Sequence, residues 1–361
     1  MGLLDDVEKH RNYIVTDSYT VTWRELISQY KDNELTINPD YQRLFRWDVD
    51  QQTQYIESIL LNIPSPPLFL ARNDDASFEV IDGLQRISTL LKFFAGEINP
   101  AKAAIIDEDE ESENDITRPT VLTEGRIVTS LEGFTAATLP ESLGRIIKYA
   151  RISIILLEKG SHKRARYEVF RRLNRFGSLL SDQEIRNCTA RLLGKEFPNQ
   201  LRELAEKPPL RAVMGLSEEA QRRMGVEEAL LRLLAFNFSQ IPLKHQIREY
   251  LDDFMEFAAE GKFKLTPEIT TRLEKTFNLL HEAIPDGNAF RLRNQGFSTN
   301  LFDIVATGVL HNIDVLTSAT LREKFEALLD SQDLKALIGA GSNTRKKLQG
   351  RIDLGKRWFA H

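Results

Sequence analysis

The sequence is poor in the residues that form covalent cross-links and soft-metal sites. It has 361 residues but a single cysteine, Cys188, so an intramolecular disulfide is impossible and a cysteine-built zinc site is not expected. Its six histidines are scattered without the spacing of a metal site, and no His-Glu-x-x-His motif occurs. Nothing in this pattern requires an oxidising compartment.

Long hydrophobic runs and targeting signals are missing too. No apolar run approaches the roughly 20 residues that a membrane helix needs. The first residues, Met1 to Asp6, do not form a basic region followed by an apolar stretch. We therefore expect a soluble, cytoplasmic protein. The Gly-x-x-x-x-Gly-Lys-Ser/Thr phosphate loop is also absent, which excludes a conventional P-loop nucleotidase.

The residues that are present have the composition of an ordinary globular protein, with 42% hydrophobic and 28% charged. An acidic block at residues 107–115 contains seven carboxylates, and removing them changes the formal net charge from -5 to +2. Such a block repels itself and stays solvated, which predicts a mobile surface insertion. An acidic strip that mimics nucleic acid or shields a basic face is the alternative. The negative net charge of the whole chain therefore does not exclude a polyanionic ligand.

Hydrophobic periodicity predicts an α+β fold in two domains. Residues 1–160 alternate β-like runs with helical patterns, and residues 161–361 are mostly helical in pattern. The expected strands are 35–37, 67–71, 78–81, 126–129 and 152–157. The expected helices are 22–30, 48–62, 83–94, 141–149, 163–176, 181–193, 226–238, 245–260, 266–283 and 299–316. Two helices begin with capping-box patterns, Thr22 with Glu25 and Ser181 with Glu184.

The segment from Ile81 to Thr89 has the pattern of a strand that turns through Asp82-Gly83 into a helix. This arrangement brings free backbone N–H groups and the positive end of a helix together, which suits an anion. Arg86 can bind phosphate oxygens, and Asp82 can hold a bridging divalent cation. The alternative is structural: Asp82 caps the helix and Gln85 completes a capping box.

Two further segments concentrate polar and aromatic groups. The first, residues 37–47, holds Tyr, Gln, Arg and Trp side chains that stack on bases or bind polar edges, although a surface loop with an aromatic anchor is the alternative. The second, residues 163–175, is a basic amphipathic helix, which is either a solvated face or a phosphate-facing stripe. Polar residues of the following helix, among them Glu184 and Arg186, exceed what a structural hairpin needs.

These segments resemble the N-terminal domain of GmrSD-type restriction endonucleases. The similarity rests on Tyr41-Gln42-Arg43 with Trp47, on Ile63-Pro64, and on the Val-Ile-Asp-Gly-x-Gln-Arg-x-x-Thr pattern that ends at Thr89. A second block, Phe170-x-x-Leu173-Asn174 followed by Leu180 to Asn187, resembles the family's later motif. The blocks follow the family's order over roughly residues 20 to 190.

The resemblance implies a ParB/sulfiredoxin-like core and a nucleotide-binding, often nucleotide-hydrolysing, role in defence against foreign or modified DNA. Leu84 stands where the family usually has a second Gln, which puts hydrolysis, but not phosphate binding, in question. Relatives often carry a His-Asn-His nuclease domain. The region after residue 190 shows no such histidine cluster, so a self-contained nuclease is not expected.

The leading hypothesis is therefore a Mg²⁺-dependent, NTP-binding and NTP-hydrolysing component of a restriction or anti-phage system. The catalytic residues would be Asp82, Gln85 and Arg86, with Asp82 as metal ligand. The residues expected to bind the nucleotide are Tyr41, Gln42, Arg43, Gly83, Thr89, Arg171, Asn174, Glu184 and Arg186. The alternative is a non-catalytic module that binds DNA or a partner and regulates a separately encoded nuclease.

Overall fold

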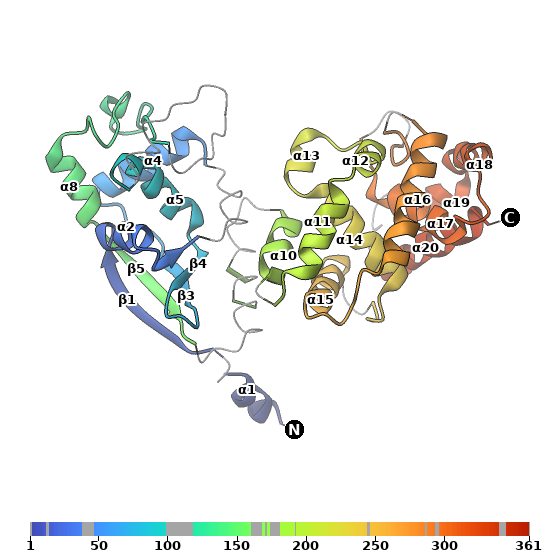
Figure 1. Ribbon diagram of the computed structural model, residues 1–361, viewed down its shortest axis with the longest axis horizontal. Helices are drawn as coiled ribbons and strands as arrows, with labels where there is room; N and C mark the ends of the chain where they lie inside the picture. Colours follow the sequence, from blue (N-terminus) through green and yellow to red (C-terminus); the bar gives the residue numbers. More distant parts are fainter. Residues whose placement is uncertain are drawn as a thin grey trace. The chain divides into compact units, whose positions relative to one another are not determined.

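The computed structural model describes residues 2–11, 14–37, 47–98, 118–159, 168–169, 172–173, 181–191, 193–243, 246–285, 287–292, 296–338 and 344–360. The chain forms two compact units, Met1–Gly177 and Ser178–His361. This division comes later in the chain than the boundary near residue 160 that the sequence suggests. The first unit contains a mixed β-sheet with helices and the second is helical, so the predicted α+β class is confirmed (Figure 1).

The sheet of the first unit has five strands in the order β1-β5-β3-β4-β2. They span Thr16–Thr22 (β1), Leu35–Thr36 (β2), Leu68–Arg72 (β3), Phe78–Asp82 (β4) and Arg151–Leu157 (β5). The central strands β3 and β5 are parallel to each other, and each has an antiparallel neighbour on its other side, β4 and β1 respectively. Leu68 and Leu70 of β3 and Ile154 and Leu156 of β5 are fully buried, so alternate positions of the centre face the core.

The helices of the first unit are α1 (Leu3–Arg11), α2 (Trp23–Lys31), α4 (Val49–Leu60), α5 (Leu84–Phe93), α6 (Ala95–Ile98) and α8 (Glu141–Tyr149), with a 3-10 turn η1 (Thr129–Leu131). Helices α2, α4, α5 and α8 begin at or next to the predicted residue, whereas α1 and α6 were not predicted. The predicted capping box of Thr22 and Glu25 is confirmed at α2, and Asp48 forms another with Gln51 at α4. Helices α2, α4, α5 and α8 pack on one side of the sheet (Figure 1).

The predicted strand at 126–129 is wrong. This segment runs as a loop into η1, and the N–H groups of Ile127 and Val128 donate to one carboxylate oxygen of Glu57, at 2.7 Å and 2.6 Å. Glu57 is itself buried in α4. A side chain from another element thus takes the donors that a strand partner would need.

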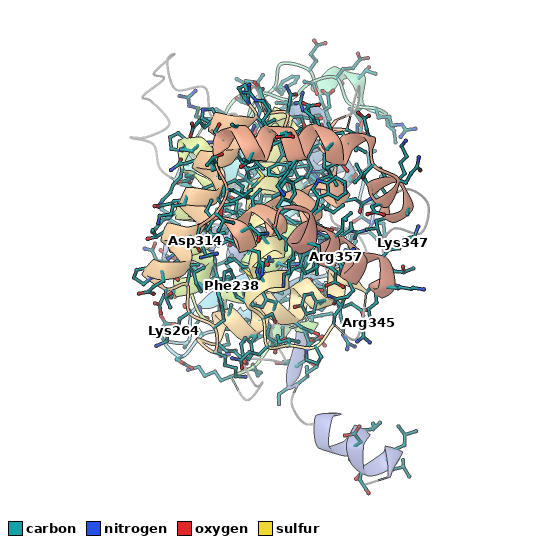
Figure 2. All side chains as sticks on the ribbon, turned by 90° about the vertical axis from the view of Figure 1, so that its right-hand side faces the viewer. Phe238, Lys264, Asp314, Arg345, Lys347 and Arg357 are labelled. Carbon is teal, nitrogen blue, oxygen red and sulfur yellow. The ribbon has the colours of Figure 1, made fainter. Side chains whose placement is uncertain are left out.

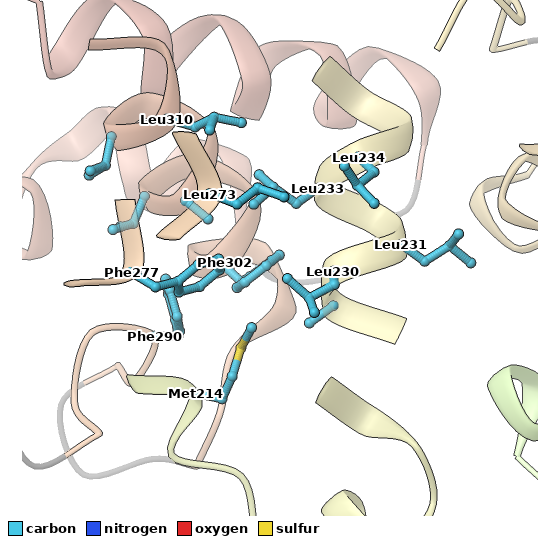
Figure 3. Packing of buried hydrophobic residues seen from close by; sticks show 14 of the residues in the cluster. Met214, Leu230, Leu231, Leu233, Leu234, Leu273, Phe277, Phe290, Phe302 and Leu310 are labelled. Carbon is cyan, nitrogen blue, oxygen red and sulfur yellow. The ribbon is translucent and has the colours of Figure 1, made fainter. Parts of the chain in front are cut away.

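The second unit packs α-helices around one apolar core. Its helices are α10 (Asp182–Arg191), α11 (Glu196–Ala205), α12 (Pro208–Met214), α13 (Glu218–Arg222), α14 (Gly225–Phe238), α15 (Ile247–Ala259), α16 (Pro267–Ala283), α17 (Thr299–Asn312), α18 (Ser318–Asp330), α19 (Gln332–Leu337) and α20 (Arg345–Trp358). Arg345 and Arg357 of α20 are exposed at the surface in Figure 2. Inside, Leu230 of α14 faces Phe302 of α17 (Figure 3). No helix among the described residues is both long and apolar enough to cross a membrane.

Candidate functional site

The site predicted at the Asp-Gly turn is built by β4, Gly83 and α5. β4 ends at Asp82, Gly83 adopts the left-handed conformation with φ 100°, and α5 begins at Leu84. A Cβ on Gly83 would lie 2.2 Å from Cδ2 of Leu68, which is fully buried. The turn therefore requires glycine for both its conformation and its space.

The alternative that Asp82 caps α5 and that Gln85 completes a capping box is wrong. The residue that caps α5 is Gly83, and no side chain accepts a capping hydrogen bond there. Oδ2 of the Asp82 carboxylate instead accepts a hydrogen bond from Nη2 of Arg86, at 3.2 Å. Gln85, expected to complete a capping box, uses its side chain elsewhere. Asp82 and Arg86 thus form an ion pair across the first turn of α5.

Arg86 also binds the segment that leads into β3. Its Nη1 donates to the carbonyl of Pro66 and, at 3.4 Å, to that of Pro67. The side chain is only 12% exposed. The guanidinium therefore joins the end of β4 to the start of β3, and it fixes the orientation of Asp82 through a charge-assisted hydrogen bond.

The Asp82 carboxylate keeps one oxygen available. Its side chain is 32% exposed, and within the described part of the chain Oδ1 accepts no hydrogen bond. The same residues contain no group of three or more His, Cys, Asp or Glu side chains that could hold a metal ion. A divalent cation at Asp82 would therefore need oxygen ligands from its bound substrate or from water, which is the usual coordination of Mg²⁺ at phosphates.

Gln85 and Thr89 contact the protein rather than lie open on one face. Oε1 of Gln85 accepts the backbone N–H of Trp47, at 3.2 Å. The hydroxyl of Thr89 is buried and donates to the main-chain carbonyl of Gln85, at 2.8 Å. The structure thus brings Trp47, Asp82, Gln85 and Arg86 into one connected region of the first unit.

An aromatic group beside this region was not predicted. Tyr55 of α4 forms a T-shaped ring contact with Trp47, with ring centroids 5.5 Å apart, and another with the buried Trp23 at 6.2 Å. Its hydroxyl lies 3.4 Å from that of Ser65, and burial raises the pKa of Tyr55. The available sequence signal was the position of Tyr55 on the apolar face of α4, beside Ile56 and Ile59.

Glu184 and Arg186 belong to the second unit, where both are buried. Ser181 and Glu184 form the predicted capping box at α10, with reciprocal bonds of 2.7 Å and 3.2 Å. Arg186 pairs with Asp252 of α15 at 2.7 Å. Local structure therefore accounts for both side chains, and their roles toward a nucleotide stay predictions.

Several predicted positions lie outside the described residues. They are Tyr41, Gln42, Arg43, Arg171 and Asn174, together with most of the basic helix at 163–175 and the whole acidic block at 107–115. The roles predicted for these residues toward a nucleotide therefore stay predictions.

The comparisons with known proteins identify the region that contains this turn. Residues 23–190 match the family of the GmrSD restriction endonuclease, N-terminal domain. No curated protein and no solved structure matches the chain. The matched region holds four of the five strands, β2 to β5, and the connected region around Asp82 and Arg86. Residues 23–190 of this chain are therefore a member of the GmrSD restriction endonuclease N-terminal domain family.

Proposed function

We propose that this protein is the nucleotide-binding component of a DNA restriction or anti-phage system, and that it binds NTP with Mg²⁺ at the turn between β4 and α5. The family of residues 23–190 supports the restriction role. The observation that carries the nucleotide site is Asp82, which is fixed by Arg86 through one oxygen and partly exposed. This carboxylate lies where a strand ends and a helix begins, as in many phosphate sites.

The arrangement matches the needs of phosphoryl transfer. Such reactions depend on positioning and charge neutralisation more than on covalent chemistry. Asp82 would hold Mg²⁺ near the positive end of α5, and the cation would supply neutralisation of the phosphate charge there. Arg86 would keep Asp82 in place and add fixed positive charge beside the phosphates. Leu84 in place of the family's usual Gln leads us to expect slow hydrolysis.

Calorimetric titration of MgATP and MgGTP tests this proposal. We expect Mg²⁺-dependent binding by the wild type and a loss of at least about tenfold in affinity for Asp82→Asn, because the cation loses its charged ligand. Asp74→Asn is the matched control, since Asp74 is an exposed carboxylate at the β3–β4 turn. Equal affinities of the two variants, or no binding of either nucleotide by the wild type, would refute the site.

A DNA-binding role is the second candidate, and α20 is the observation that favours it. This helix opens with Arg345, Lys346 and Lys347, so three cations lie at its positive end, where they are not stabilised by the helix dipole. Arg345 and Lys346 are exposed. If they contact phosphates, the double variant Arg345→Ala, Lys346→Ala should weaken duplex DNA binding. The slope of the logarithm of the binding constant against the logarithm of the salt concentration should also fall by about two, one for each lost phosphate contact. An unchanged salt slope would count against this role.

A further inference from the structure

The main chain of Trp47 is held from both sides by glutamine side chains. Its N–H donates to Oε1 of Gln85 in α5, at 3.2 Å, and its carbonyl accepts from Nε2 of Gln52 in α4, at 2.8 Å. Gln52 is 1% exposed, and its Oε1 accepts the hydroxyl of Thr120, at 2.9 Å. A continuous chain of hydrogen bonds therefore runs from the first turn of α5 through Trp47 to the segment that follows the acidic block.

The ring of Trp47 is fixed as well as its backbone. It packs on Tyr55, whose ring centroid lies 5.5 Å away and whose ring plane lies at 60° to the indole. Tyr55 is in turn held by the buried Trp23. Trp47 itself is only half-buried. A rigid, partly exposed indole loses little conformational entropy when a flat ligand stacks on it, and tryptophan offers the largest aromatic surface for a nucleobase.

We infer that Trp47 is the surface on which the nucleobase stacks, and that Gln85 is a positioning residue that acts through Trp47. This inference rests on the proposed nucleotide site, and it names Trp47 as the residue of that site that binds the base. The amide oxygen of Gln85 is the atom that a water-orienting glutamine would use, and here it accepts the N–H of Trp47. Gln85 therefore connects the Asp82–Arg86 turn to the aromatic platform, and the phosphates and the base are held by one framework.

A double-mutant cycle tests the coupling in the full chain. Gln85→Leu and Trp47→Leu should each weaken MgNTP binding by about tenfold, since a stacked base contributes on this scale. The double variant should bind no more weakly than Trp47→Leu alone, because Gln85 acts through Trp47. Losses that multiply to about a hundredfold would show that Gln85 contacts the nucleotide directly, and they would overturn the inference. Gln54→Leu, an exposed glutamine of the same helix as Gln52, is the control and should bind as the wild type does.

Two measurements separate this inference from the proposed function. In the ligand-free protein, Gln85→Leu should accelerate hydrogen exchange of the Trp47 amide, whereas Gln54→Leu should not. Unchanged exchange in Gln85→Leu overturns the positioning role, whether or not a nucleotide binds. Bound nucleotide should also quench tryptophan emission in the wild type and much less in Trp47→Leu, and equal quenching overturns the stacking role. If the wild type binds no nucleotide, the stacking role falls with the proposed function, and the exchange measurement still decides the role of Gln85.

Discussion

At the scale of single residues, the Asp-Gly-Leu-Gln-Arg motif is first a structural junction. Gly83 makes the turn possible, Arg86 joins Asp82 to the carbonyls of Pro66 and Pro67, and Gln85 holds Trp47. The Asp82 side chain is 32% exposed, and among the described residues its Oδ1 accepts no hydrogen bond. Gly83, Gln85 and Arg86 therefore all stabilise the same junction between β4 and α5.

Gly83→Ala should destabilise the first unit by about 1–3 kcal/mol, since a non-glycine residue would have to adopt φ 100°. The overlap of its Cβ with Leu68, at 2.2 Å, adds to this loss. Urea denaturation of the full chain, followed by circular dichroism, measures the change. Gly96→Ala is the control, because a Cβ there meets no atom within 4 Å and φ is not positive. Equal effects of the two substitutions would contradict this account.

The sequence predicted the components of this site better than their contacts. A strand, a glycine turn and a helix follow from local pattern, and all three are confirmed. The pairing of Arg86 with prolyl carbonyls some 20 residues earlier does not, because it depends on how β3 and β4 align. The same holds for Gln52, whose polar side chain on a buried face is explained only by Trp47 and Thr120.

At the scale of elements, local signals identified about half of the helices of the described residues and one of the two edge strands, β2. The helices that were not predicted are α1, α6, α11, α12, α13, α18, α19 and α20. Capping boxes at α2 and α10 were visible because they are formed by residues three apart. β1 was missed since its residues, Thr16–Thr22, are mostly polar and exposed, and only pairing with β5 makes them a strand. Residues 126–129 were mistaken for a strand because their donors bind the distant Glu57.

A buried charge network joins three helices of the second unit. Asp303 of α17 accepts hydrogen bonds from Arg232 of α14, at 2.8 Å, and from Arg351 of α20, at 2.9 Å. The Arg351 side chain is fully buried, and desolvation lowers its pKa despite the opposing effect of Asp303. One carboxylate thus neutralises part of two guanidinium charges in an apolar core, and its loss would leave both uncompensated.

Asp303→Asn should therefore destabilise the second unit by about 3–5 kcal/mol, since breaking a buried ion pair leaves an uncompensated charge. Thermal and urea unfolding of the full chain measure the loss. Asp314→Asn is the matched control, because Asp314 pairs with Arg272 at the surface, at 3.0 Å. An exposed pair contributes about 0–1 kcal/mol. A loss for Asp303→Asn no larger than that of the control would show that the network does not hold the helices together.

At the scale of the whole molecule, each of the two units has a hydrophobic core of its own. The apolar cluster of the second unit is contributed by residues from Ala190 to Phe359. The first unit has its own core, where strand residues such as Leu70 and Ile154 and helix residues such as Leu90 and Ile147 are fully buried. The family match covers the first unit from residue 23 onward and only the beginning of the second. The proposed nucleotide chemistry therefore belongs to the first unit, and the basic helix α20 to the second.

Two separate cores predict two unfolding transitions in differential scanning calorimetry of the full chain, because each unit can lose its packing without the other. Gly83→Ala should lower the midpoint of one transition, and Asp303→Asn that of the other, each by several degrees. If the nucleotide site is in the first unit, MgNTP should raise only the transition that Gly83→Ala lowers, since a ligand stabilises the unit that binds it. A single transition moved equally by both variants would instead mean that the two units unfold as one cooperative body.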